Sequence, residues 1–119
     1  MSKKVLIVDD DEMLLRATAR GLKARGWTVS TASGSVVPSR ELAEVALLDW
    51  EPHGPDMAKR CQLAGIPFVV YTGNFPEAET LRQQGIMALT KPALTVDLSN
   101  ALEAMIDVAK GDPERRSCW

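Results

Sequence analysis

The stretch "VLIVDDDE", residues 5–12, sets four aliphatic residues directly before four carboxylates. A short apolar run of this kind is typical of a strand that is buried on both faces of a parallel sheet. Two ionised carboxylates about 4 Å apart repel each other by roughly 4 kcal/mol at an effective dielectric constant near 20. A folded chain therefore needs a reason to gather them, such as a bound cation, a helix N-terminus or full solvation.

Four further apolar runs follow along the chain and alternate with segments of helical period. These runs cover residues 27–31, 45–48, 68–71 and 87–89. The alternation is typical of an α/β fold in which helices cover both faces of a parallel sheet. We therefore expect a doubly wound parallel sheet with five strands.

The segments differ in how strongly their sequences predict a helix. A helix is expected between residues 13 and 24, and a longer one over residues 96–109, closed by Gly111. The segments 55–65 and 76–85 each begin with proline and end with glycine, as short helices of two to three turns do. The segment "SGSVVPSREL", residues 33–42, leaves room for about one helical turn because of its glycine and proline. A loop is an equal alternative there.

The composition limits the classes of function. A chain of 119 residues, 45% of them hydrophobic, fits one domain with a substantial core. Its net charge of -2 offers no basic surface for nucleic acid, and no apolar stretch approaches the roughly 18 residues of a membrane span. The two cysteines, Cys61 and Cys118, are too few for a disulfide framework, and Cys61 is expected to be a buried thiol in a helix. We therefore expect a soluble, cytoplasmic protein that binds neither nucleic acid directly nor membranes.

Polar side chains follow four of the expected strands. These residues are Asp9 and Asp10, Asp49 in "ALLDW", Thr72 in "VVYTG" and Lys91 in "ALTKP". Taken singly, each has an ordinary role as a helix cap or a solvated side chain. Ligands of open α/β sheets bind at the carboxyl ends of the strands, so the four positions together predict one site at that edge.

With these residues the sequence resembles the receiver (CheY-like) domain of bacterial two-component response regulators, over residues 3 to about 109. That family carries an acidic pair, an Asp, a Thr or Ser and a Lys-Pro after successive strands. The resemblance implies a flavodoxin-like sheet of order 2-1-3-4-5, with middle helices that are shorter here than usual. It also implies a cis bond between Lys91 and Pro92. The chain divides on this basis into a receiver domain, residues 1–110, and a C-terminal tail, residues 111–119.

The resemblance implies a phosphoryl-transfer site. Asp49 would be the nucleophile, accepting a phosphoryl group from a sensor histidine kinase, a phosphotransfer protein or a small acyl phosphate. Lys91 would offset the charge of the phosphoryl oxygens, while Thr72 and the backbone N–H groups near Trp50 and Gly73 would hydrogen-bond them. The movement of Thr72 would then signal to an unknown downstream protein.

The resemblance also implies roles for the carboxylates of the acidic run. Mg²⁺, which prefers oxygen ligands, would be bound by Asp10, Asp49 and the backbone carbonyl of Glu51. Asp9 would reach the ion mostly through water. Asp11 is expected to cap the following helix instead, where a negative charge suits the helix dipole.

The chain departs from the family at several positions. Ala88 stands three residues before the Lys-Pro pair, where many receivers carry the Tyr or Phe that moves with the Thr. Tyr71 is expected to pack in the core rather than to replace that aromatic residue. His53, in the unusual loop "WEPHGP", is expected to be solvated rather than a proton relay. Glu51 and Asn74 occupy the two positions that tune hydrolysis in the family.

Two other classes of function stay open beside a non-enzymatic phosphoacceptor. One is a pseudo-receiver, an interaction module that keeps the site without being phosphorylated. The other is a haloacid-dehalogenase-like phosphatase, because Asp9 and Asp11 form a D-x-D pair after the first strand. Met13 stands where that signature has Thr or Val, and the chain holds no cap domain. Whether the receiver acts alone or within a longer protein is left open by the sequence.

Overall fold

The computed structural model describes residues 3–111, which form five strands and four helices. In chain order these are β1 (Lys3–Val8), α1 (Glu12–Ala24), β2 (Trp27–Ala32), β3 (Val45–Leu48), α2 (Gly54–Ala64), β4 (Phe68–Thr72), α3 (Phe75–Gln83), β5 (Ala88–Thr90) and α4 (Thr95–Gly111). The strands are all parallel, in the order β2-β1-β3-β4-β5. The predicted fold class and strand order are confirmed. The predictions for Cys118 and for the tail beyond Gly111 lie outside the described residues.

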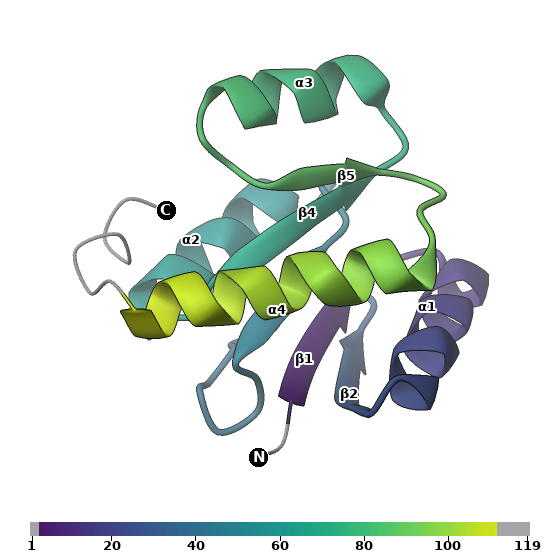
Figure 1. Ribbon diagram of the computed structural model, residues 1–119. Helices are drawn as coiled ribbons and strands as arrows, with labels where there is room; N and C mark the ends of the chain where they lie inside the picture. Colours follow the sequence, from purple (N-terminus) through teal and green to yellow (C-terminus); the bar gives the residue numbers. More distant parts are fainter. Residues whose placement is uncertain (1–2, 112–119) are drawn as a thin grey trace.

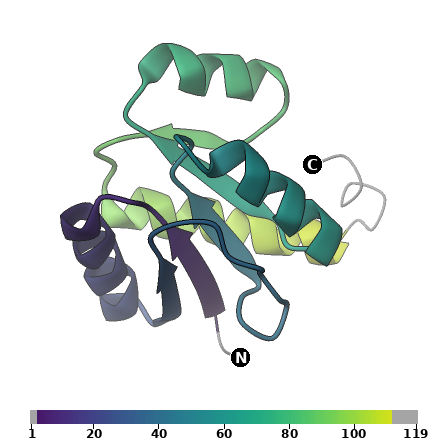
Figure 2. The same cartoon turned by 180° about the vertical axis from the view of Figure 1, so that it is seen from behind.

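Helices cover both faces of the sheet. Helices α1 and α4 pack on one face, and α2 and α3 pack on the other. Figure 1 shows α4 crossing in front of the sheet, and Figure 2 brings α2 to the front. Along β1, Val5 and Ile7 belong to the core under α1 and α4, whereas Leu6 and Val8 belong to the core under α2 and α3. Strand β1 is apolar on both sides for this reason.

The connection between β2 and β3, residues 33–44, is a loop with a single turn, so the loop alternative is confirmed. Strand β2 suits this arrangement because Ser30 and Ala32 lie opposite Leu6 and Val8 in the register. Small and polar side chains on this face leave little apolar surface that a helix would have to cover. Val36, from the loop itself, packs against the same core.

The helix ends follow their sequence signals. Asp11 caps α1, as predicted, and its carboxylate accepts a hydrogen bond from a backbone N–H in the first turn. Asn74 caps α3 by accepting from the backbone of Glu77 at 3.0 Å. Gly65 caps the C-terminal end of helix α2, and its φ of 73° lies in the left-handed region that favours glycine. Cys61 of α2 is fully buried, as expected, and burial raises the pKa of its thiol to about 12.

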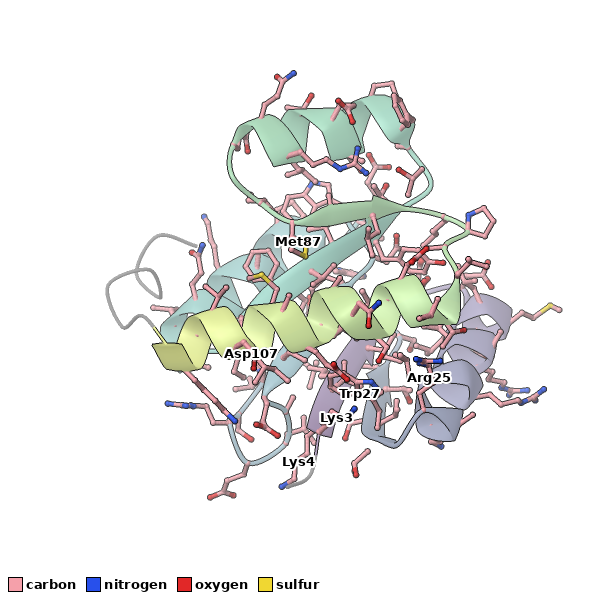
Figure 3. The ribbon with its side chains drawn as sticks, in the orientation of Figure 1. Lys3, Lys4, Arg25, Trp27, Met87 and Asp107 are labelled. Carbon is pink, nitrogen blue, oxygen red and sulfur yellow. The ribbon has the colours of Figure 1, made fainter. Side chains whose placement is uncertain are left out.

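The amino end of the sheet is tied to α4. Trp27 is buried at the start of β2 and donates through Nε1 to the hydroxyl of Ser99 at 2.9 Å. Figure 3 shows Trp27 close to Lys3, whose ammonium lies 5.4 Å from the ring centroid. Lys3 also forms an ion pair with Glu103 at 2.7 Å. These contacts lie at the opposite end of the strands from Asp49. Within residues 3–111, no helix is both long and apolar enough to cross a membrane.

Candidate functional site

Three carboxylates meet where β1 and β3 end. The two strands are neighbours, with Val8 opposite Leu48, so the residues that follow them leave the sheet side by side. Carboxylate oxygens of Asp9, Asp10 and Asp49 all lie within 4.8 Å of one another. We call these three residues the acidic cluster. The sequence predicted that they would meet at this edge, and the structure brings them together.

Lys91, which follows β5, reaches this cluster. Its ammonium lies 2.9 Å from Oδ2 of Asp9 and 3.1 Å from Oδ1 of Asp49. Its backbone N–H donates to the carbonyl of Thr72 at 2.8 Å. The Lys91-Pro92 bond is cis, as predicted. Burial lowers the pKa of Lys91, but its hydrogen bonds and ion pairs with the two carboxylates outweigh burial and raise the pKa above its usual value. Lys91 is therefore the cation that offsets part of the charge of the cluster.

The cluster could bind a metal ion, and its members differ in how available they are. Asp9 is 5% exposed, and both of its oxygens are engaged: Oδ2 by Lys91, and Oδ1 by the backbone N–H of Asp11 at 2.9 Å. Asp10 is exposed. This difference favours Asp10 and Asp49 as direct ligands of a hard cation, with Asp9 behind them. Glu51, also expected at the metal, lines the same small cleft as the three carboxylates.

The environment of Asp49 disfavours its charged form. Burial raises the pKa of this carboxyl from 3.8 to about 6; the negative charge of Asp9 adds to the shift, and the ammonium of Lys91 opposes it. A cation beside Asp49 would favour the ionised form and lower the pKa again. The site is therefore one in which an additional positive charge is stabilising.

Thr72 lies at the same edge of the sheet, but its hydroxyl is engaged elsewhere. Its Oγ1 donates to a carboxylate oxygen of Glu77 at 2.9 Å and accepts from the backbone N–H of Asn74 at 3.1 Å. Thr72 is 4% exposed. The hydroxyl is therefore bonded to the start of α3. Glu77 was not among the predicted site residues, although a Glu three residues after the capping Asn74 is the spacing of a capping box and could have indicated a role at this helix end.

Tyr71 packs in the core under α1 and α4, as expected. It also has a second role that was not predicted from the sequence. Its hydroxyl accepts a hydrogen bond from the backbone N–H of Ala93 at 2.9 Å, and its ring centroid lies 5.5 Å from the ammonium of Lys91. Tyr71 therefore contacts both ends of the segment from Lys91 to Ala93.

The structure places three further residues that the sequence singled out: Ala88, His53 and Asp11. Ala88 is buried, and its carbonyl accepts a hydrogen bond from Nε of Arg82 on α3 at 2.8 Å. His53 is half-buried, with Nδ1 3.4 Å from the hydroxyl of Ser35. Within residues 3–111 it makes no hydrogen bond to the acidic cluster, which argues against a relay. The side chain of Asp11 is occupied in capping α1 and lies outside the cluster, which argues against the D-x-D site of a phosphatase.

No family model matches the sequence, and no curated protein matches it. Solved structures do match. A response regulator receiver domain from Clostridium thermocellum has a TM-score of 0.76 and 24% identity, over 91% of this chain and 97% of that one. A CheY-like receiver domain from Methanospirillum hungatei has a TM-score of 0.70 and 22% identity, over 92% of this chain and 98% of that one.

A third match is a response regulator from Burkholderia pseudomallei, whose structure is described with a phosphorylated aspartic acid, a calcium ion and citrate. Its TM-score is 0.70 and its identity 24%, over 92% of this chain and 71% of that one. At these identities a structural likeness establishes the fold. This chain has the receiver fold of response regulators, with an acidic cluster at the carboxyl edge of its sheet.

Proposed function

We propose that this protein is a phosphoacceptor receiver domain in which Asp49 takes up a phosphoryl group in a Mg²⁺-dependent reaction. The observation that carries the proposal is the Lys91 ammonium, which is bonded to both Asp9 and Asp49 at the edge of a receiver fold. The Burkholderia pseudomallei response regulator, described with a phosphorylated aspartic acid and a calcium ion, supports this chemistry on the same fold.

The transfer is a displacement at phosphorus. A carboxylate oxygen of Asp49 attacks, and a new P–O bond forms as the bond from phosphorus to the donor atom breaks. The electron pair of the broken bond leaves with the donor, either as an imidazole that takes up a proton or as acetate. Hydrolysis of the resulting acyl phosphate by water restores the carboxylate.

The side chains around Asp49 supply the electrostatics. Lys91 is held in place by Asp9 and can offset charge on the transferring oxygens. A bound Mg²⁺ would offset the remaining negative charge. Its protein ligands would be the carboxylates of Asp10 and Asp49 and the backbone carbonyl of Glu51. Asp9 would contact the ion through water. Thr72 would hydrogen-bond a phosphoryl oxygen, and its movement would signal that Asp49 is phosphorylated.

The partners follow from this chemistry. A sensor histidine kinase or a phosphotransfer protein would supply the phosphoryl group, and a downstream protein would recognise the phosphorylated form. The protein would act as a signalling domain in the cytoplasm, with no reaction beyond its own phosphorylation and dephosphorylation. Its site residues would be Asp49, Thr72 and Lys91, besides the metal ligands.

Intact-mass measurement after incubation with acetyl phosphate and Mg²⁺ tests the proposal. We expect the mass of one added phosphoryl group, its loss when EDTA replaces Mg²⁺, and its loss in Asp49→Asn. Asp56→Asn is the matched control, because the Asp56 carboxylate pairs with Arg60 and Ser35 and is not one of the three carboxylates of the acidic cluster. Undiminished labelling of Asp49→Asn would move the acceptor to another residue.

A pseudo-receiver is the second candidate. It is favoured by the hydroxyl of Thr72, which is bonded to Glu77, and by the absence of an aromatic side chain at Ala88. On this alternative the protein would bind Mg²⁺ but gain no mass from acetyl phosphate or from a phosphorylated phosphotransfer protein. The same measurement therefore separates the two functions.

A further inference from the structure

We propose that Glu77 is a positioning residue that competes with the phosphoryl group for the hydroxyl of Thr72 and so sets how readily the site switches. The inference rests on the proposed function and adds a residue to it. It starts from one contact, the 2.9 Å hydrogen bond from Thr72 Oγ1 to the Glu77 carboxylate.

A hydroxyl has one proton to donate. In this structure Thr72 gives that proton to Glu77, while one of its lone pairs accepts from the backbone N–H of Asn74. A phosphoryl oxygen is only an acceptor, so a hydrogen bond from Thr72 to a phosphoryl group would need the same proton. The two acceptors therefore exclude each other.

The bond is strong enough to matter. Its acceptor is ionised, and charge-assisted hydrogen bonds are shorter and stronger than neutral ones. Thr72 is 4% exposed and Glu77 is half-buried, so water competes poorly for the hydroxyl. The contact therefore stabilises the unphosphorylated arrangement of the site.

Breaking the bond has a consequence for α3. The backbone N–H of Glu77 donates to the side chain of Asn74, which caps the helix, and Asn74 in turn donates to Thr72. The three residues form a closed set of hydrogen bonds between the end of β4 and the first turn of α3. If Thr72 turns toward a phosphoryl group, this set opens and the start of α3 is released.

The chain needs such a device because the usual aromatic residue is absent. Ala88 cannot swing a ring, and its carbonyl is held by Arg82, which also pairs with Glu79. The hydrogen bonds among Thr72, Asn74 and Glu77 link the site to α3 directly. They can carry the signal from the site to α3 without an aromatic side chain.

The test is the affinity for beryllofluoride, a mimic of the phosphoryl group, at saturating Mg²⁺. It is measured from the amide NMR signals of Gly73 and Asn74. Removing the competing acceptor in Glu77→Ala should tighten binding by about tenfold, because an ion-assisted hydrogen bond no longer has to be broken. Glu77→Gln keeps a weaker acceptor and should fall between. Glu79→Ala is the matched control and should bind as the parent does, because Glu79 pairs with Arg82 on the same helix.

A double-mutant cycle separates this mechanism from a simple loss of negative charge. In a Thr72→Ala background, Glu77→Ala should have no effect on affinity, whereas a through-space effect of charge would persist. Thr72→Ser keeps a hydroxyl and should retain the dependence on Glu77. Equal affinity of the parent and Glu77→Ala, or an undiminished effect without the hydroxyl, would overturn the inference alone. Absence of beryllofluoride binding in the parent and in every variant would overturn the proposed function with it.

Discussion

Asp49 makes the stability of the metal-free protein depend on pH. Its pKa is about 6 in the folded protein, against 3.8 for the ordinary carboxyl, because it is buried. Between these values the folded state binds more protons than the unfolded state, so the free energy of unfolding falls as the pH rises from about 4 to about 6. Urea unfolding in EDTA at several pH values measures this slope. Asp49→Asn should flatten it; an identical slope in that variant would assign the titration to another group.

Asp10 is the member of the acidic cluster whose removal separates repulsion from metal binding. It is exposed, yet one of its oxygens lies within 4.8 Å of those of Asp9 and Asp49. Mg²⁺ at a hundred times its dissociation constant should stabilise the parent by about 2.7 kcal/mol. Asp10→Asn should weaken that gain and raise the melting temperature of the metal-free protein, because one repelling charge is gone. Thermal unfolding with and without Mg²⁺ checks both; a metal-free variant that melts below the parent would contradict the repulsion.

At the scale of residues, the sequence predicted where the side chains of the site lie, but not which hydrogen-bond partners they have. Asp9, Asp10, Asp49 and Lys91 could be placed together because the ends of parallel strands meet at one edge. The hydrogen bond between Thr72 and its glutamate partner could not, since the choice of acceptor depends on the conformation of the loop after β4. Burial, and hence the raised pKa of Asp49, likewise depends on packing from several elements.

The start of α2 is packed closely against the residue next to Asp49. A Cβ at Gly54 would lie 2.6 Å from the Trp50 ring and 3.0 Å from the backbone oxygen of Asp49. Gly54→Ala should therefore lower the melting temperature and shift Trp50 fluorescence, although alanine favours a helix over glycine by about 1 kcal/mol. Gly73→Ala is the matched control, because the space around Gly73 is open. It should change the melting temperature little; equal effects of the two substitutions would remove the argument from packing.

At the scale of elements, the apolar runs located all five strands. The bounds of some strands differ from the prediction, because strand pairing rather than hydrophobicity determines where a strand begins and ends. Lys3 and Lys4 join β1 because they pair with the first residues of β2. Strand β5 begins at Ala88 rather than Met87, because its pairing with β4 starts there. The proline and glycine signals placed α2 and α3 to within two residues. The segment 33–42 remained open because its glycine and proline are compatible with either one helical turn or a loop.

The whole molecule is stabilised by two hydrophobic cores, one on each face of the sheet. The cost of a substitution should therefore depend on whether the residue lies in a core. Leu102 of α4 is fully buried in the core under α1 and α4, whereas Leu63 of α2 is 90% exposed. Leu102→Ala should cost about 2–5 kcal/mol of unfolding free energy. Leu63→Ala, the same chemical change, should stay within about 0.5 kcal/mol. Urea unfolding of both variants measures the difference, and similar costs would mean that the cores are not arranged as described.

The connection over residues 33–44 contains no helix or strand, so the chain can be lengthened there. Val37 is 79% exposed, and the loop runs over the surface on the α2 side in Figure 2. Doubling the length of a flexible loop adds only about 0.6 kcal/mol of closure entropy. An inserted peptide tag or small reporter domain after Val37 would therefore leave the sheet intact, because no helix or strand lies between β2 and β3 that an insertion would have to break.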